Sequence, residues 1–284
     1  MRISLLIPTR NRLEEIERNL RAVFFGSIQP FEVIVSDDSD DEIAPEIERV
    51  AKKFSEVKYV RGPRNGLSAN RNWLTARSSG DFIVFVDDDA QVDKNYFKNI
   101  TDCYNKYSQL YGEKIIITGK EIRNGTEVTP CELTFLGHQK KIPQDLKHPK
   151  TIVINSTLFP RDLFKQAQFD ENLHYGYDEV DIMCQAQILG YNTVFCPEAV
   201  NKHNSSFVNR ELYAEILERN RIYEMLKIYG IYERKHLKCL VYFIIASLHL
   251  FIHNIKFKKF YFLREIAQAL KMFFDFKKKY YKAY

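Results

Sequence analysis

The sequence predicts an α/β protein in which a mixed, mostly parallel sheet is flanked by helices and followed by a C-terminal helical extension. Two observations lead to this fold class. In the first third of the 284 residues, short apolar runs alternate with segments of helical period, as in strand–helix–strand crossovers. After residue 209 the pattern is that of long helices. A hydrophobic content of 45% with 28% charged residues is ordinary for a globular protein and excludes wholesale disorder.

The first third supplies four predicted strands, each joined to the next by a helix. The first apolar run ends at Pro8, and the segment after it repeats apolar residues at the spacing of one helix face. The turn residues Asn65 and Gly66 precede the third helix. The predicted strands cover residues 3–7, 31–36, 57–60 and 81–86, and the predicted helices cover residues 13–25, 43–54 and 67–77.

The rest of the chain alternates less regularly. From residue 121 to 150 the pattern weakens, and we interpret this segment as loops and short strands beside a cleft. Pro197 is predicted to end the last strand. The further predicted strands cover residues 115–118, 151–159 and 191–196, and the further predicted helices cover residues 95–110, 178–189 and 210–230.

Composition and charge limit the compartment and the chemistry. The five cysteines lie far apart without a CxxC pair, which favours a reducing compartment and argues against a zinc site. The N-terminal apolar stretch is too short for the core of a signal peptide, so we expect a protein that starts in the cytoplasm. Residues 1–203 hold 26 Lys or Arg against 30 Asp or Glu, whereas residues 204–284 hold 16 against 7. The first 203 residues therefore carry a net negative charge and the last 81 a net positive charge.

Polar residues follow three of the predicted strands at the point where each strand ends. They are Pro8-Thr9-Arg10-Asn11-Arg12, Ser36-Asp37-Asp38 and Asp87-Asp88-Asp89. Ligands of parallel sheets bind at the carboxyl ends of the strands, so these residues are candidates for a site. Three consecutive aspartates are either a solvated turn or a site for a cation. In an extended segment alternate side chains point the same way, so Asp87 and Asp89 would share one face.

These residues belong to a larger set of ordered blocks. The blocks read ISLLIPTRNR, FEVIVSDDSDDE, RNGLSANRN, SGDFIVFVDDDA, FDENLHYGYDEVDI and PEAVNKH. In this set the sequence resembles the family 2 nucleotide-sugar glycosyltransferases, which have the GT-A fold, from residue 2 to about residue 228. Several blocks in order at sensible spacing are more specific than any single acidic motif.

The resemblance implies a binding site for a nucleotide-sugar donor with Mn²⁺ or Mg²⁺. Asp89 would contact the metal, Asp87 the ribose or the metal shell, and His203 the metal or the diphosphate. Asp37 would accept a hydrogen bond from N3–H of uracil or thymine, although helix capping remains an alternative for the acidic pair Asp37-Asp38. For Arg71 a structural ion pair is an equal alternative to donor contact. The donor-binding candidates are Pro8, Thr9, Arg12, Asp37, Asp38, Asn65, Gly66, Arg71, Asp87 and Asp88.

The same resemblance assigns the chemistry to the start of the helix predicted at residue 178. Inverting sugar transfer needs a base that takes the proton of the acceptor hydroxyl. The family commonly has a Glu-Asp pair here, whereas this chain has Asp178-Glu179 in the reversed order. We favour Glu179 as the base and Asp178 as the acceptor-binding residue, and the converse assignment stays open. Asp181 is interpreted as structural.

Two other enzyme classes fit less well. Phosphatases of the haloacid dehalogenase type carry Asp-x-Asp on their first strand, whereas these aspartates follow the fourth predicted strand. Processive polysaccharide synthases carry several membrane spans and a Gln-x-x-Arg-Trp signature, and the single tryptophan, Trp73, lies in no such context. We therefore expect the transfer of one sugar per encounter.

The C-terminal region is basic and rich in aromatic residues. Residues 239–252 are almost all apolar but too few to span a membrane. Beyond them, an apolar stripe is predicted on one helix face, with lysines away from it. The stripe comprises Leu263, Ile266, Leu270 and Phe273. We expect residues 239–284 to contact an anionic membrane surface, with a packed helical pair or an oligomer interface as the alternative. No nucleic-acid motif accompanies the charge, so a nucleic-acid partner is not expected.

Together these interpretations predict a catalytic domain over residues 1–209 and a helical membrane-associating region over residues 210–284. The donor half would cover about residues 1–120 and the acceptor half about residues 121–209. The expected activity is metal-dependent, inverting and non-processive transfer from a UDP- or dTDP-sugar to a glycan or lipid-linked acceptor, at the inner face of the cell membrane. A non-catalytic nucleotide-sugar-binding protein on the same fold is the alternative, and a homo-oligomer is left open.

Overall fold

A mixed, nine-stranded sheet forms the centre of the chain in the order β3-β2-β1-β4-β10-β6-β11-β5, with β7 paired to β6. The computed structural model describes residues 1–141, 143, 145, 147–205, 210–256 and 262–283. The strands of this sheet are β1 (Ile3–Thr9), β2 (Glu32–Asp37), β3 (Val57–Arg61), β4 (Phe82–Phe85), β5 (Ala90–Val92), β6 (Ile115–Arg123), β7 (Thr126–Val128), β10 (Thr157–Pro160) and β11 (Asn192–His203). Of these, β5, β7 and β10 run against the other six.

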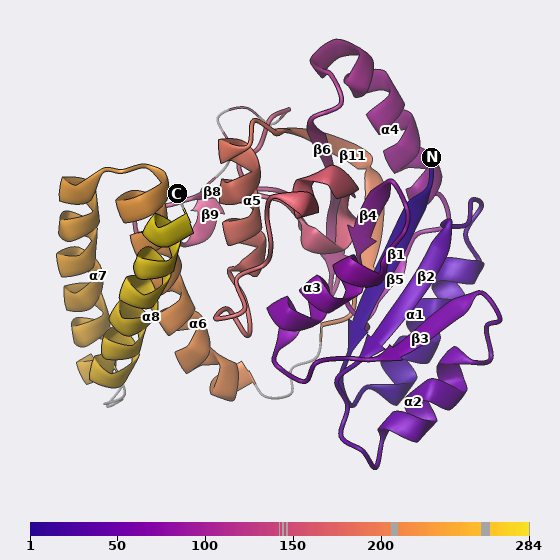
Figure 1. Cartoon of the computed structure of the whole chain (residues 1–284), viewed down its shortest axis with the longest axis horizontal. Coiled ribbons are helices and arrows are strands. Elements are labelled where there is room, and N and C mark those ends of the chain that lie inside the picture. Colours follow the sequence, from indigo (N-terminus) through magenta and orange to yellow (C-terminus); the bar gives the residue numbers. More distant parts are fainter. Residues whose placement is uncertain (142, 144, 146, 206–209, 257–261, 284) are drawn as a thin grey trace.

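Helices cover both faces of this sheet, and the C-terminal helices stand beside it (Figure 1). The helices are α1 (Leu13–Phe24), α2 (Ala44–Ala51), α3 (Leu67–Arg77), α4 (Tyr96–Tyr111), α5 (Asp178–Ile188), α6 (Arg210–Lys227), α7 (His236–Lys256) and α8 (Phe262–Ala283). Short elements complete the set, namely the hairpin strands β8 (Glu132–Leu133) and β9 (Gln139–Lys141), the 3₁₀ turns η1 (Ile154–Ser156) and η2 (Arg161–Lys165), and the π-helix η3 (Ile228–Tyr232). Within the described residues, no helix combines the length and the apolar character needed to cross a membrane.

The central strand β1 shows why the sheet needs helices on both faces. All seven of its residues are buried. Leu5 and Ile7 pack into one apolar core, which includes residues of α1 and α4. Leu6 packs into a second core, which includes residues of α3 and α5. Because successive side chains of a strand point to opposite faces, a strand that carries apolar residues on both faces has to be covered on both.

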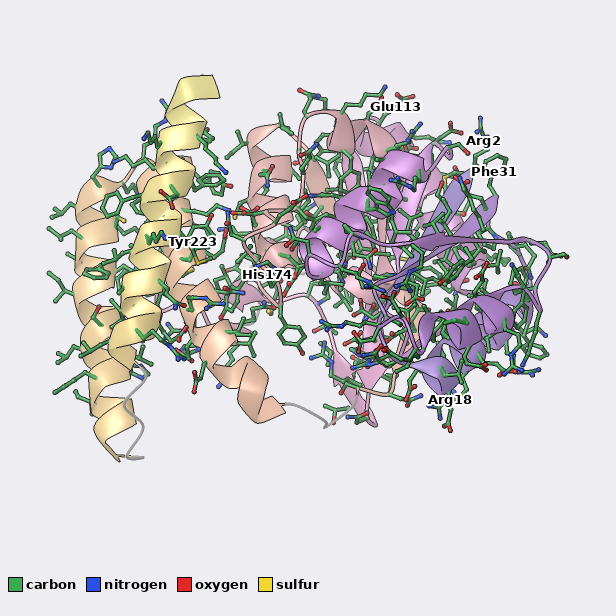
Figure 2. The ribbon with its side chains drawn as sticks, turned by 60° about the horizontal axis from the view of Figure 1, so that its bottom comes forward. Arg2, Arg18, Phe31, Glu113, His174 and Tyr223 are labelled. Atoms are coloured by element: carbon green, nitrogen blue, oxygen red, sulfur yellow. The ribbon has the colours of Figure 1, made fainter. Side chains whose placement is uncertain are left out.

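A third apolar core joins the C-terminal helices to the rest of the chain. It contains Leu173 and Val180 from the segment around the start of α5, together with Tyr223, Tyr242 and Phe273 from α6, α7 and α8. Figure 2 labels Tyr223 in this interface, where its ring lies 6.4 Å from that of Phe276 on α8. The C-terminal helices are therefore packed onto the region that carries α5.

Most predicted elements of the first 120 residues are confirmed, and three later predictions need correction. Residues 151–159 do not form one strand, because Asn155 and Ser156 lie in η1 and only residues 157–160 pair in the sheet. Pro197 does not end the last strand, since β11 continues to His203. The proline falls where the pairing with β6 shifts register, between Phe195 and Val200, so its missing N–H costs no ladder bond. The helix after residue 209 ends at residue 227 and continues as η3.

The apolar stripe predicted on the last helix is mainly a packing face. Phe273 is buried, and Ile266 and Leu270 are half-buried against the third core, so these residues face the protein. Leu263 alone of the four is strongly exposed, at 67%. This corrects the expectation that the stripe faces a membrane, because most of its apolar surface is already covered by α6 and α7.

A buried charge cluster accompanies the third core. Nζ of Lys227 on α6 lies 2.6 Å from a carboxylate oxygen of Asp181 on α5 and 2.8 Å from one of Asp170. The hydroxyl of Tyr232 also donates to Asp181. Burial alone would lower the pKa of Lys227, but Asp181 and Glu224 raise it well above its ordinary value, so the lysine is charged. The cluster ties α6 to the first turn of α5.

Replacing the lysine of this cluster should destabilise the fold strongly. In Lys227→Met, Asp170 and Asp181 stay buried without their cation, and removing one partner of a buried ion pair costs about 3–5 kcal/mol. The matched control is Lys52→Met, because Lys52 is exposed and pairs with Glu48 on the same helix face, which contributes at most about 0.5 kcal/mol. Urea unfolding of both variants measures the difference. Equal midpoints would contradict the role given to the cluster.

Candidate functional site

The polar residues predicted to meet at the strand ends do meet. Thr9 is the register partner of Asp37 across β1 and β2, and the N–H of Asp38 donates to the carbonyl of Thr9. The segment Asp87–Asp89 connects β4, which pairs with β1, to the short strand β5. The parallel strands thus bring the three polar segments to one edge of the sheet.

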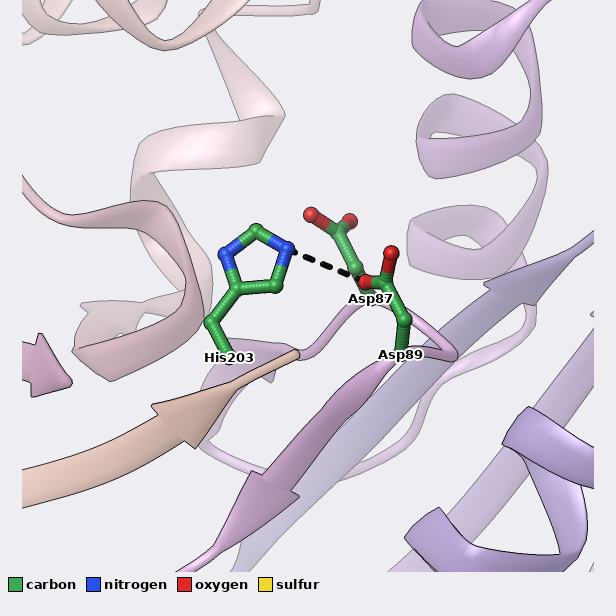
Figure 3. A group of neighbouring side chains, drawn as sticks. All are labelled: Asp87, Asp89 and His203. Atoms are coloured by element: carbon green, nitrogen blue, oxygen red, sulfur yellow. Dashed lines mark ion pairs between the residues drawn. The ribbon is translucent and has the colours of Figure 1, made fainter. Parts of the chain in front are cut away.

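Two aspartates and a histidine form a cluster of metal-ligating type (Figure 3). One ligand atom from each of Asp87, Asp89 and His203 lies within 4.8 Å of the others. Nε2 of His203 is 3.1 Å from Oδ1 of Asp89. Asp88 points away from the cluster and accepts a hydrogen bond of 2.8 Å from the hydroxyl of Thr9. Asp87 and Asp89 thus share one side as predicted, but the segment is a turn closed by the N–H of Ala90 on the carbonyl of Asp87 rather than an extended strand.

Behind the cluster, His203 is held by a second acid that the sequence analysis missed. Nδ1 of His203 lies 3.2 Å from Glu121, a fully buried residue of β6. Burial alone would lower the pKa of His203, but hydrogen bonds to Asp89 and Glu121 raise it to about 10. Asn155, also missed, donates to Glu121 and accepts a hydrogen bond from the N–H of Asp87. The available signal for Glu121 in the sequence is weak: an acid that follows the strand predicted at residues 115–118 by three positions.

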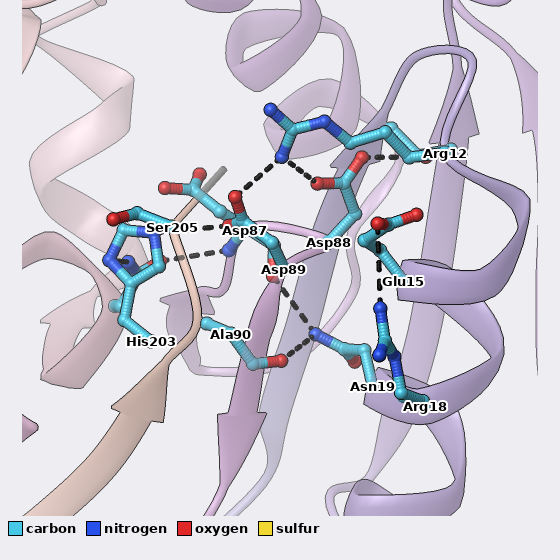
Figure 4. A network of polar contacts seen from close by, with 12 residues as sticks. Arg12, Glu15, Arg18, Asn19, Asp87, Asp88, Asp89, Ala90, His203 and Ser205 are labelled. Carbon is cyan, nitrogen blue, oxygen red and sulfur yellow. Dashed lines mark hydrogen bonds and ion pairs between the residues drawn. The ribbon is translucent and has the colours of Figure 1, made fainter. Parts of the chain in front are cut away.

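Arginine and asparagine side chains of the first loop and of α1 hold the acidic segment (Figure 4). Nη1 of Arg12 lies 3.0 Å from Asp88 and 2.5 Å from Asp89. Burial raises the pKa of Asp88 to about 7, although Arg12 acts to lower it. Asn19 donates to the carbonyls of Asp87 and Ala90 and so fixes the turn between them. A small hollow beside this segment is lined by Glu15, Arg18, Asp88, Asp89, Gln91 and Asn204.

Arg71 connects the acidic segment to helix α5. Its guanidinium is almost completely buried and donates through Nη2 to Asp87, at 2.9 Å, and through Nη1 to Asp178. The structural ion pair that the sequence left open for Arg71 is thus observed, with two partners rather than one. One side chain spans from the predicted metal ligands to the predicted catalytic pair.

Glu179 and Asp178 occupy different environments at the start of α5. Asp178 is buried and bound to Arg71, whereas Glu179 is half-buried and accepts a 2.8 Å hydrogen bond from the amide of Gln139. Burial and the neighbouring Asp178 raise the pKa of Glu179 to about 7. No cation among the described residues pairs with Glu179, and a carboxylate that titrates near neutral pH in this way has the properties of a general base. The helix N-terminus favours acids at both positions.

The acidic pair after β2 is held within the chain. Asp37 is fully buried and accepts hydrogen bonds of 2.8 Å from the Tyr59 hydroxyl and from Arg61, and a third from the N–H of Ser39. Asp38 accepts a hydrogen bond from the N–H of Arg64. Neither side chain caps α2, so the capping alternative does not apply. The contact of Asp37 with a base stays a prediction.

Comparison with known proteins decides the family. The family model described as Glycosyl transferase family 2 matches residues 4–165, more than half of the chain. This chain belongs to glycosyl transferase family 2. A Campylobacter jejuni GalNAc(5)-diNAcBac-PP-undecaprenol beta-1,3-glucosyltransferase is 24% identical over 141 residues, 45% of this chain and 46% of the relative. An uncharacterized glycosyltransferase of Rickettsia bellii is 31% identical over 225 residues, 75% of this chain and 31% of the relative. The chain thus spans less than half the length of these two relatives.

Solved structures share the fold of this family 2 member. GalNAc-T7 with UDP, GalNAc and Mn²⁺ superposes with a TM-score of 0.67 at 16% identity, over 82% of this chain and 49% of that one. TarS 1–349 of S. aureus superposes with a TM-score of 0.63 at 18% identity, over 96% of this chain and 80% of that one. The mannosyltransferase PcManGT of Pyrobaculum calidifontis, in complex with GDP-Man and Mn²⁺, superposes with a TM-score of 0.59 at 15% identity, over 95% of this chain and 74% of that one. The predicted fold class is confirmed.

The remaining donor candidates of the family 2 chain lie near the site but outside the acidic cluster. Pro8 is buried in β1. Gly66 precedes α3 with φ of +91°, and a Cβ at this position would lie 2.5 Å from Nδ1 of His174. The carbonyl of Asn65 accepts from the same ring nitrogen, 3.1 Å away. In the structure, these two residues join the start of α3 to the segment before α5.

Arg71 should be hard to replace even by another cation. In Arg71→Met, two carboxylates lose their shared partner, so we expect a loss of about 3–5 kcal/mol. Arg71→Lys should fall between that variant and the wild type, because one ammonium cannot reproduce the two-armed guanidinium. Arg49→Met is the control, since Arg49 is exposed and pairs with Glu46 on its own helix. Thermal unfolding ranks the variants, and a lysine variant as stable as the wild type would refute the bridging role.

Proposed function

We propose that this chain is a metal-dependent, inverting glycosyltransferase that moves one sugar from a nucleotide-sugar to a hydroxyl of a glycan or lipid-linked acceptor. One observation carries the proposal: Arg71 bonds both Asp87, in the cluster of metal-ligating type, and Asp178, beside a glutamate that titrates near pH 7. A site for the leaving diphosphate and a base for the acceptor hydroxyl would then lie on either side of one guanidinium.

The donor atoms suit a hard divalent cation. Asp87 and Asp89 supply carboxylate oxygens and His203 a ring nitrogen, a set that fits Mn²⁺ and, through its oxygens, Mg²⁺. Bound there, the cation would neutralise the negative charge that grows on the diphosphate as the sugar leaves. Arg12 and His203 pair with Asp89 in the structure, and the raised pKa of His203 keeps its ring protonated at neutral pH. Metal binding would therefore require both contacts to rearrange and His203 to lose a proton.

Side chains of this chain would accept the proton of the acceptor hydroxyl and hold the groups that react in place. The acceptor oxygen attacks the anomeric carbon, the bond from that carbon to the diphosphate oxygen breaks, and the acceptor proton passes to the Glu179 carboxylate. Gln139 orients Glu179 through its hydrogen bond, and Asp178 is positioned by Arg71. A nucleoside diphosphate and an elongated acceptor are the products. Attack on the face opposite the leaving group inverts the anomeric centre.

The relatives support the reaction class and differ in the sugar and the nucleotide. One is described as a glucosyltransferase acting on an undecaprenol-linked glycan and another as a minor teichoic acid biosynthesis protein, GgaB of Bacillus subtilis. The solved structures were determined with UDP and GalNAc, with UDP-GlcNAc or with GDP-Man. We propose UDP or dTDP as the donor nucleotide because a carboxylate at the position of Asp37 can accept the N3–H that uracil and thymine share. Asp37 is fully buried and bonded to Tyr59 and Arg61 in the structure, so this contact would require those bonds to open.

Nucleotide binding should depend on the metal and on Asp89. A ligand present at about 100 times its dissociation constant adds about 2.7 kcal/mol of stability, roughly 5 °C or more for a chain of this size. We expect this upward shift of the melting temperature with UDP or dTDP plus Mn²⁺, and its loss with EDTA or in Asp89→Asn. Asp162→Asn, which changes an exposed acid outside the site, should keep the shift.

The same thermal-shift panel contains GDP and CMP. A shift with GDP alone would move the donor assignment to guanosine, because the base edge differs. The absence of a shift with every nucleotide, or a shift that survives in Asp89→Asn, would refute the metal-dependent donor site.

Glu179→Gln should abolish turnover without removing donor binding. General-base catalysis contributes about 10²- to 10⁴-fold, and we expect kcat to fall by that factor while the nucleotide-induced shift remains. In the wild type, the raised pKa means that Glu179 is protonated below about pH 7 and cannot accept a proton, so kcat/KM should fall about tenfold per pH unit as the pH drops below that value. Asp162→Asn should retain both the rate and the pH profile.

Release of nucleoside diphosphate from each candidate donor measures this turnover. A glutamine variant with wild-type kcat would show that Glu179 is not the base and would move the role to Asp178. A wild-type protein that binds nucleotide but turns over no donor with any acceptor would favour the non-catalytic binding protein.

A further inference from the structure

The outward face of helix α7 is an apolar surface that no described part of the chain covers. Figure 1 shows α7 as the outermost element, at the end of the molecule farthest from β2 and β3. Its outward residues repeat at helical spacing and are between 43% and 76% exposed. We call this surface the α7 outer face, and it comprises Leu237, Leu240, Ile244, Ile245, Leu248 and Ile252.

The opposite face of α7 already fixes the helix to the protein. Tyr242, Ala246 and Leu250 are buried in the third core, and the ring of Tyr242 packs against that of Tyr229. The α7 outer face therefore adds nothing to the apolar core of the described chain. A contiguous exposed apolar surface of this kind normally marks an interaction site.

The positive charge of helices α7 and α8 favours an anionic partner for the α7 outer face. Residues 236–256 contain no acidic residue, and α7 and α8 together hold eight Lys or Arg against two acids, a net charge of +6. Lys271 and Lys278 of α8 are exposed. A second copy of the chain would bring two such positive regions together, whereas an anionic lipid surface is complementary to them.

We propose that the α7 outer face docks on the anionic inner surface of the cell membrane, with the helix lying in the plane of the lipid headgroups. Because no described helix is long and apolar enough to cross a bilayer, α7 would lie on the membrane surface. The six aliphatic side chains enter the boundary between headgroups and acyl chains, and the exposed lysines of α8 attract lipid phosphates. The membrane-contacting part of residues 239–284 is thereby moved from the stripe on α8 to the outward side of α7. This inference goes beyond the proposed catalysis, since it requires neither donor nor acceptor.

Sedimentation with lipid vesicles tests the surface directly. The full chain is mixed with vesicles of phosphatidylcholine alone or with about 30% phosphatidylglycerol. We expect binding to the anionic vesicles, weaker binding to the neutral ones, and at least about tenfold weaker binding for Ile244→Ser/Leu248→Ser, which removes apolar surface from the outer face. Ile28→Ser/Leu110→Ser is the matched control, because these residues are 46% and 66% exposed on other elements, and it should bind like the wild type.

A second variant separates charge from apolar contact. Lys271→Glu/Lys278→Glu leaves the α7 outer face intact and should weaken binding to anionic vesicles about tenfold while leaving binding to neutral vesicles unchanged. Urea midpoints equal to that of the wild type show that each variant is folded.

Three results would overturn the proposal. The first is a wild-type chain that fails to sediment with anionic vesicles, and the second is an outer-face serine variant that sediments like its control. The third is a dimer in analytical ultracentrifugation that the outer-face serines, but not the control serines, convert to monomer without any vesicle binding, which would make a second copy the partner. None of these measurements uses a sugar donor, so they remain informative if the proposed transferase activity fails.

Discussion

The buried guanidinium of Arg71 is the contact on which the geometry of the site depends. A cation removed from water has to be met by acids, and acids removed from water have to be met by a cation. Here Asp87 comes from the edge of the sheet and Asp178 from helix α5, two segments about 90 residues apart in sequence. Both acids bind the same guanidinium, which links the acidic segment to the start of α5 beside Glu179.

The sequence predicted the parts of the fold that depend on local pattern. Alternating strands and helices of the first 120 residues follow from apolar periodicity, and the meeting of three polar segments at strand ends follows from the topology of a parallel sheet. The errors came where tertiary pairing overrides local preference. Pro197 lies inside a strand because the register shifts around it, and Phe273 faces inward because α6 offers an apolar partner. Arg12 and Glu121 hold the site through contacts more than 75 residues away in sequence, which no local pattern reveals.

The C-terminal helices act on the site through packing and charge together. Residues of α6, α7 and α8 share the third core with Leu173 and Val180, which flank Asp178 and Glu179. Lys227 adds a buried ion pair with Asp181, which lies in the same first turn of α5. The domain boundary predicted at residue 209 remains a prediction. Residues before it and residues after it both pack against helix α5. The orientation of the proposed base therefore depends on residues that lie more than 40 positions downstream.

The position of β10 has a consequence for how the chain folds as it is synthesised. This strand lies between β4 and β6 in the sheet, although both of those strands precede it in the sequence. Residues 1–123 therefore cannot reach their final arrangement until residues 157–160 have left the ribosome, because a strand slot in the middle of the sheet stays open. Until residues 157–160 are synthesised, the facing edges of β4 and β6 are unpaired. Unpaired strand edges can pair wrongly or aggregate during that time.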